Sequence, residues 1–346
     1  MNKYKTLALN TAVFAIGSFS SKLLSFLLTR LYTANLDSAL FSTKEVLEMF
    51  ANLLIPVVSF SVTDAIIRYG LDKNYEKQAV FSNAVTVLIF GAGGFLLLSP
   101  LLLLYKDIRP FVPLLVGYII ISCFRQVSTQ FARARGFVRL YAADGILCTL
   151  TLFIFNVIFI SWLQLGITGF LLSVMFSDLL SGITVWIAAG HQQFYSRKYV
   201  DKELLEVMLR FSLPLIPTAV LWIITGFSDR LFIRHIMTRQ DAGVYSAATK
   251  IPNLISMVST IFYQAWNMSA IAENDSKARS AFYSQVYEAY QAMLTLAAGF
   301  IIALDVPLSY MLIARKDPSY ETAYLYTPVL VIAVLLMCYN QFLSSI

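Results

Sequence analysis

Three cations lie inside apolar runs of this sequence, where a charge is costly unless it meets a partner, a ligand or water. They are Lys22, Arg125 and Lys250. Structural roles are available, because Lys22 can pair with Asp64 or Asp178 and Arg125 can extend to the inner membrane surface. In a cavity of low dielectric constant, fixed cations would instead attract an anion such as phosphate. The charges alone leave both interpretations open.

Uncharged polar side chains follow helical faces in four apolar segments. At 100° per residue, the polar positions of segment 8–31 fall within about 60° of one another, and those of 45–67 within about 80°. Segments 212–236 and 242–267 carry similar stripes. Such residues can join helices to one another, but four stripes together predict a polar cavity lined by these segments. The candidate binding residues are Lys22, Ser25, Asn52, Arg125, Thr225, Lys250, Asn253 and Gln264.

Four further residues are candidates for structure or gating. Pro56 and Pro252 are expected to kink the segments that contain them. Asp229 and Arg230 lie near the end of an apolar run. We expect these two charges to pair with neighbours and to lock an outer corner of the protein.

The elements that must position these residues are membrane-spanning helices. The chain has 346 residues, of which 58% are hydrophobic and 13% charged, and its mean hydropathy is +0.70. A soluble domain is about a quarter charged. The apolar runs are continuous over about 20 residues, which favours helices over short alternating barrel strands. The sequence therefore predicts an all-α integral membrane protein with ten spans, at 8–31, 45–67, 80–103, 111–132, 143–163, 167–189, 212–236, 242–267, 284–305 and 325–346.

The basic residues indicate an orientation. With the N-terminus inside, 14 of the 26 Lys and Arg residues fall in inner segments and 9 in outer ones. Because cytoplasmic loops are enriched in Lys and Arg, we expect a cytoplasmic N-terminus. The same pattern explains the net charge of +6 without a nucleic-acid partner.

A weak internal repeat predicts two pseudo-symmetric lobes. A shift of 204 residues aligns "LSFLLTRLYTANLDSALFS" with "SDRLFIRHIMTRQDAGVYS". Transporters are often built from such repeats. We expect a six-helix N-terminal lobe at 1–190, a cytoplasmic linker with a short helix at 191–211, and a four-span lobe at 212–346. The second lobe is expected to be truncated, because it has fewer spans than the first.

Motifs for catalysis, metals and cofactors are missing from the sequence. It has no GxxxxGK[ST] loop, no HExxH, no CxxC pair and no GxSxG. We expect no catalytic residue, metal or cofactor, and a protein that is not an enzyme. A membrane-embedded polymerase or glycosyltransferase would be expected to have a large charged outer loop, which the sequence lacks.

The segments "MLRFSLPLIPTAVLWIITGFSDRLFI" and "DAGVYSAATKIPNLISMVSTIFYQAWN" carry a resemblance. Their Pro-x-x-Pro, Asp-Arg and Gly-x-Tyr-Ser-x-Ala patterns are similar to those of the polysaccharide-biosynthesis flippases. These proteins belong to the multidrug/oligosaccharidyl-lipid/polysaccharide exporter superfamily. The matching residues are Pro214, Pro217, Asp229, Arg230, Gly243, Tyr245, Ser246, Ala248 and Trp266.

The resemblance implies two helical lobes around a cavity that opens alternately to each side of a bacterial inner membrane. The implied cargo is an undecaprenyl-pyrophosphate-linked oligosaccharide, with membrane lipids, a polysaccharide polymerase and glycosyltransferases as partners. Lys22, Arg125 and Lys250 would then counter the pyrophosphate. A cation-coupled drug antiporter is the alternative, although such proteins usually carry an acidic residue in span 1. An inactive fragment is a further alternative.

Overall fold

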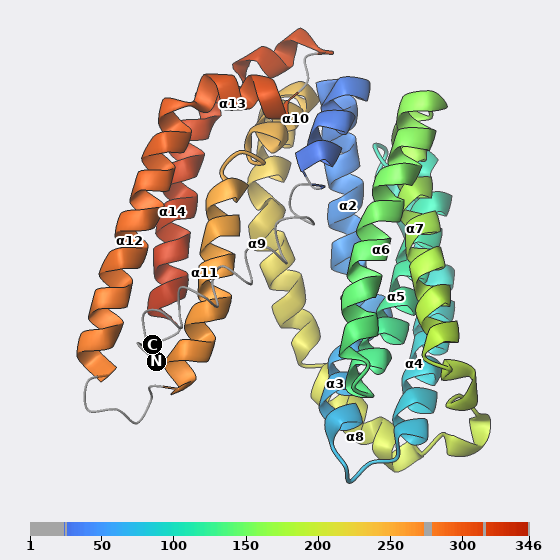
Figure 1. Cartoon of the computed structure of the whole chain (residues 1–346). Coiled ribbons are helices and arrows are strands. Elements are labelled where there is room, and N and C mark those ends of the chain that lie inside the picture. Colours follow the sequence, from blue (N-terminus) through green and yellow to red (C-terminus); the bar gives the residue numbers. More distant parts are fainter. Residues whose placement is uncertain (1–23, 25, 273–278, 314–315, 345–346) are drawn as a thin grey trace. The chain divides into compact units, whose positions relative to one another are not determined.

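Helices are the only regular secondary structure in the part of the chain that the structure describes. The computed structural model describes residues 24, 26–272, 279–313 and 316–344, and no strand occurs among them. Seven helices are long and apolar enough to cross a membrane, or eight if one bent pair counts as a span. This architecture follows from the hydrocarbon environment, in which a backbone must satisfy its own N–H and C=O groups. The predicted all-α membrane fold is confirmed (Figure 1).

The described helices fall into two compact units. Unit 2 comprises Ser42–Arg239, and unit 1 comprises the residues up to Phe41 together with those from Gln240 onward. The lobes expected at 1–190 and 212–346, with a linker at 191–211, stay predictions. Unit 2 holds most of α2 (Ser38–Val58), then α3 (Val62–Leu71), α4 (Lys77–Leu98), α5 (Val112–Ala134), α6 (Val138–Asn156), α7 (Gly166–Ala188), α8 (Lys202–Ser212) and α9 (Leu215–Ile236). Unit 1 holds residues 26–35, α10 (Arg239–Ala248, whose first residue belongs to unit 2), α11 (Asn253–Ala272), α12 (Arg279–Ala303), α13 (Asp305–Leu312) and α14 (Thr327–Leu343).

Two expected spans are interrupted. The span expected at 45–67 is the bent pair α2 and α3, whose axes differ by 50°. The span expected at 242–267 divides into α10 and α11, with Pro252 directly before α11. The first expected span, 8–31, lies largely outside the described residues.

The break between α2 and α3 is a strained corner. Phe60 and Ser61 adopt left-handed backbone angles, with φ of 51° and 48°, which are unfavourable for residues other than glycine. Pro56 lies inside α2, one turn before the break. Gly91 of α4 makes the corner possible, because a Cβ there would lie 1.9 Å from the Val58 carbonyl oxygen.

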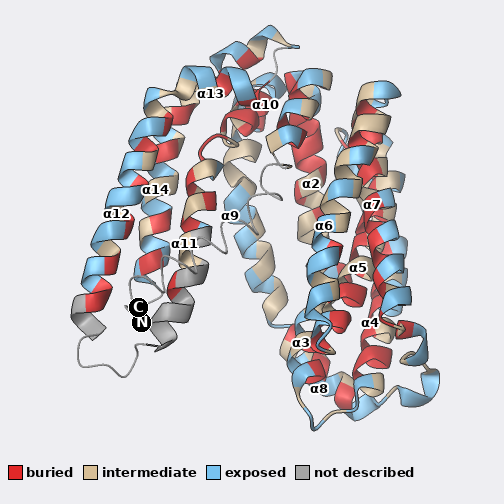
Figure 2. Cartoon of the chain, in the orientation of Figure 1, coloured by how far each residue is buried: buried red, intermediate tan, exposed pale blue. Residues whose placement is uncertain are grey.

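The core of unit 2 lies along α5 and α7. Figure 2 shows buried residues concentrated along these helices. At one end of this core His191 packs against the rings of Phe81 and Phe131, each with a centroid distance of 5.1 Å. Its Nε2–H donates to the Ser128 carbonyl oxygen at 2.9 Å. Burial lowers the pKa of His191 to about 4, so the ring is neutral at physiological pH.

The short helix expected in the 191–211 connection is α8. Asp201 caps its start by accepting a hydrogen bond from the Glu203 N–H at 2.9 Å. The side chain of Asn83 on α4 binds the backbone of Asp201. Its amide donates to the Asp201 carbonyl at 3.0 Å and accepts from the Asp201 N–H at 3.2 Å. The connection is therefore fixed to the helical bundle of unit 2.

In unit 1, Asp317 ties two distant segments together. One carboxylate oxygen accepts from the Ser38 N–H at 3.0 Å and from the Ser38 hydroxyl at 2.7 Å. The other accepts from the Ser319 N–H at 2.9 Å. Burial alone would raise the pKa of Asp317, but these hydrogen bonds outweigh it and lower the pKa to about 2.

Gly91→Ala is expected to destabilise the protein by about 1–3 kcal/mol, because the new methyl group meets a backbone oxygen that cannot move aside. Thermal unfolding in detergent measures this effect. Gly93→Ala is the matched control, since no atom lies within 4 Å of its Cβ position. Equal unfolding temperatures for the two variants would contradict this account of the corner.

Stability is expected to fall as the pH is lowered from about 6.5 towards 4. In this window the unfolded chain protonates His191, whose ordinary pKa is 6.5, while the folded chain keeps it neutral down to a pKa of about 4. Unfolding temperatures measured across this range should show a shallower slope in His191→Phe. An unchanged slope in that variant would assign the acid sensitivity to another group.

Candidate functional site

A polar pocket in unit 1 brings together two of the candidate binding residues. The Lys250 pocket has a volume of about 340 Å³ and is lined by Phe26, Thr29, Lys250, Asn253, Ser256, Met257 and Thr260. Lys250 lies in the break between α10 and α11, and Asn253 is the first residue of α11. Of the described residues that line this pocket, Lys250 alone is charged. The pocket thus combines one cation with hydroxyl and amide groups.

The local sequence explains the break beside Lys250. Pro252 cannot donate a backbone hydrogen bond, so a helix cannot continue through it unaltered. The chain turns instead, with the N–H groups of Lys250 and Ile251 bonded to the carbonyls of Ala247 and Ala248 at 3.1 and 3.2 Å. The turn places Lys250 and Asn253 in the lining of one pocket.

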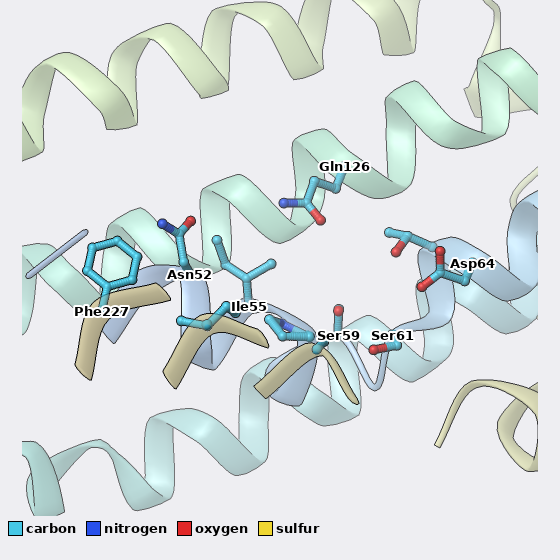
Figure 3. A pocket seen from close by; sticks show the side chains of 11 residues that line it. Asn52, Ile55, Ser59, Ser61, Asp64, Gln126 and Phe227 are labelled. Carbon is cyan, nitrogen blue, oxygen red and sulfur yellow. The ribbon is translucent and has the colours of Figure 1, made fainter. Parts of the chain in front are cut away.

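A second polar pocket lies in unit 2. The Asp64 pocket has a volume of about 370 Å³ and is lined by Asn52, Ile55, Pro56, Ser59, Ser61, Thr63, Asp64, Gln126, Ala219, Ile223 and Phe227. Figure 3 shows Asn52 and Phe227 towards one end, and Ser61 and Asp64 towards the other. The pocket follows the broken corner between α2 and α3, with α5 and α9 supplying the other walls.

Sequence reasoning placed only part of this second pocket. Asn52 was a binding candidate, and Ser59 and Thr63 belong to the polar stripe of segment 45–67. The sequence indicates Asp64 only as a partner for Lys22, and it gives no reason to select Gln126. The signal for Asp64 was an acidic residue within an apolar run, close to the stripe. Gln126 gave no signal, because its role depends on α5 lying against the corner.

The remaining binding candidates fall elsewhere. Thr225 is exposed on α9, and its hydroxyl donates to the Leu221 carbonyl at 2.8 Å. Lys22 and Ser25 lie outside the described residues, as does the side chain of Gln264. Roles for these four residues stay predictions.

Arg125 is held by acidic residues of its own unit. Its guanidinium lies 3.2 Å from Asp144 of α6 and 3.6 Å from Asp178 of α7, and its Nε donates to Ser181 at 2.7 Å. Ser122 and Ser181 donate further hydrogen bonds to these carboxylates. The charge of Arg125 is therefore balanced inside the bundle, and a role in binding cargo stays a prediction.

The charged residues at the end of α9 are organised around Arg234. This residue is buried on α9 and donates to Asp107 at 2.7 Å and to the Ser42 hydroxyl at 2.7 Å. Asp229 accepts from the backbone N–H of Arg230 at 2.8 Å, and the Arg230 guanidinium lies 4.7 Å from the centre of the Phe227 ring. The lock expected of Asp229 and Arg230 stays a prediction, and Arg234 supplies a lock that sequence reasoning missed.

The two pockets contain groups that suit non-covalent binding. Among the described residues, no group of three or more His, Cys, Asp or Glu side chains could hold a metal ion. What the two pockets offer is hydrogen-bonding groups, with a cation in one and a carboxylate in the other.

Comparison with known proteins gives the family and the fold. The family described as polysaccharide biosynthesis protein matches residues 7–267. Protein 1 of the Lsg locus of Haemophilus influenzae is 25% identical over 271 residues, which are 76% of this chain and 64% of that protein. The chain therefore spans less than two thirds of that relative.

Two solved structures show the same fold. A multidrug resistance transporter of the MATE family and MOP superfamily, in an inward-facing conformation, matches 96% of this chain and 83% of its own, with a TM-score of 0.71 and 16% identity. A MATE family transporter in an outward-facing conformation matches 99% of this chain and 82% of its own chain, with a TM-score of 0.62 and 16% identity. At these identities the likeness concerns the fold alone.

Arg125→Ala is expected to destabilise the protein by about 3–5 kcal/mol, since it leaves Asp144 and Asp178 without their cation. Thermal unfolding of the purified protein measures the loss. Arg133→Ala, at an exposed position of the same helix, is the control and should change stability little. If Arg125→Ala unfolds like the wild type, the network is not structural.

Proposed function

We propose that this chain, which belongs to the polysaccharide biosynthesis protein family, is a flippase that moves a lipid-linked oligosaccharide across a membrane by alternating access. The family and the fold support a membrane transporter. The observation that carries the finer proposal is the Lys250 pocket. It places a cation beside hydroxyl and amide groups at the break between α10 and α11.

The chemistry of the Lys250 pocket suits the polar part of such a cargo. An ammonium group in a protein cavity attracts phosphate more strongly than it does in water. Hydroxyl and amide groups can exchange hydrogen bonds with sugar hydroxyls, since both kinds of group donate and accept. Asn253, Ser256 and Thr260 supply these groups around Lys250. A pyrophosphate with an attached glycan would use both properties.

The setting and partners form part of the same proposal. The chain would lie in a bacterial inner membrane with its N-terminus in the cytoplasm, as the distribution of basic residues favours. Its cargo would be an undecaprenyl-pyrophosphate-linked glycan. Glycosyltransferases would supply this cargo and a polymerase would consume it.

A drug antiporter on the same fold makes a different prediction. It would raise resistance to organic cations and leave surface polysaccharide unchanged. The cation in the Lys250 pocket favours an anionic cargo, because it would repel a cationic drug.

Lys250→Ala is expected to reduce surface polysaccharide severalfold, because the pocket loses its charge for the pyrophosphate. The combination with Lys22→Ala should abolish it. The measurement is glycan staining of cells in which only the variant gene is present, with protein abundance followed by immunoblot.

The controls separate charge from folding. Lys250→Arg should retain most of the polysaccharide, and Lys73→Ala changes an exposed lysine between α3 and α4. Normal polysaccharide in the double variant, at wild-type abundance, would refute an anion-binding role for these lysines.

A further inference from the structure

The Asp64 pocket contains hydrogen-bonding groups that the protein itself does not use. In the part of the chain that the structure describes, no hydrogen bond or ion pair engages the side chains of Asn52, Ser59, Thr63, Asp64 or Gln126. Ser59 is completely buried, and its hydroxyl oxygen has no partner. A buried hydroxyl without a hydrogen bond is costly. The cost is removed if a ligand supplies the missing bonds.

The backbone around these groups is held in an unfavourable shape. The left-handed residues Phe60 and Ser61 lie between Ser59 and Asp64 in sequence. Strain of this kind persists only where surrounding structure enforces it, and it clusters at active sites, ligand-binding sites and switch regions. Close packing of α4 holds this backbone in place, and Gly91 permits that packing because it has no Cβ to meet the Val58 carbonyl. The corner therefore sets the positions of the polar groups before a ligand arrives.

The size of the pocket argues against a bare ion. Its volume of about 370 Å³ is within the range of small-molecule sites. Oxygen ligands hold a divalent metal ion at about 2.0–2.6 Å, so an ion would fill only a small part of this space. A phosphate is disfavoured as well, because Asp64 alone among the described lining residues is charged.

The lining matches a ring that has hydroxyl groups on its rim and C–H groups on its faces. Asp64 accepts hydrogen bonds, while the amides of Asn52 and Gln126 both accept and donate. Ile223 and Phe227 of α9 add apolar surface. Figure 3 shows Gln126 projecting from α5 over the middle of the pocket, between the groups at its two ends.

We propose that the Asp64 pocket binds one sugar unit of the cargo glycan and selects a neutral or amino sugar over an acidic one. The proposal rests on the proposed function, because it assigns part of that cargo to this pocket. The Asp64 carboxylate repels the carboxylate of a uronic acid and attracts an ammonium group. The pocket thereby distinguishes one sugar from another, in addition to the recognition of the lipid-linked phosphate.

Saturation-transfer NMR of the full-length chain in lipid nanodiscs tests this assignment. The probes are the methyl glycosides of glucose, glucosamine and glucuronic acid. The wild type should bind the first two and bind the glucuronide at least about tenfold more weakly. Gln126→Ala should weaken binding of all three by roughly tenfold, as expected for lost hydrogen bonds.

Asp64→Asn tests the role of the charge, because a loss of stability alone would not change which glycoside the protein prefers. The variant keeps the shape of the side chain and removes its charge, so the preference for glucoside over glucuronide should disappear. Thr184→Ala is the control, because Thr184 is exposed on α7 and its hydroxyl bonds to the Leu180 carbonyl of its own helix. An unchanged preference in Asp64→Asn, or Asp64-dependent binding of ²²Na⁺ without any sugar signal, would overturn the proposal.

A parallel assay separates this proposal from the proposed function. If the wild-type gene restores surface polysaccharide to a deletion strain but the protein binds none of the glycosides, the sugar pocket fails and the flippase proposal stands. If the glycosides bind with the expected preference and the deletion strain has normal polysaccharide, the flippase proposal fails, and the pocket stands as a sugar site without its assignment to that cargo.

Discussion

Backbone hydrogen bonding in hydrocarbon is the constraint on which this structure depends. Each N–H and C=O group inside a bilayer needs a partner, and an uninterrupted helix supplies all of them locally. A break in a helix is tolerated there only where the exposed groups meet protein, water or a ligand. The chain breaks expected spans at two places, between α2 and α3 and between α10 and α11. Each break borders a polar pocket.

The charges inside the spans divide according to their surroundings. Arg125 and Arg234 meet carboxylates of their own unit, and these pairs hold helices together. Lys250 and Asp64 lie in the linings of pockets, beside helix breaks. A charge in the lining of a pocket lies where it can also act on a cargo. The pocket of unit 1 carries a positive charge, and the pocket of unit 2 carries a negative one.

Much of the fold was predictable because membranes impose simple rules on sequence. Continuous apolar runs predicted the all-helical fold. The spans expected at 80–103 and 111–132 lie within helices long enough to cross a membrane, and those at 143–163 and 167–189 exceed theirs by one residue. Prolines pointed to the interrupted spans, although the first break occurs a turn beyond Pro56, at Phe60 and Ser61. That displacement depends on the close approach of Gly91, which no local pattern reveals.

The sequence by itself determined the polar stripes of the helices, since periodicity fixes the face of a regular helix on which a side chain lies; the break beside Pro252 lies outside that rule. On that basis Lys250 and Asn253 were grouped, and they line one pocket. Only the tertiary structure decided which faces meet. It joined Arg125 to Asp144 and Asp178, and it placed Gln126 and Asp64 in the lining of one pocket. The physical reason is that helix packing is set by the fit of whole surfaces, and that fit is not contained in the period of any single helix.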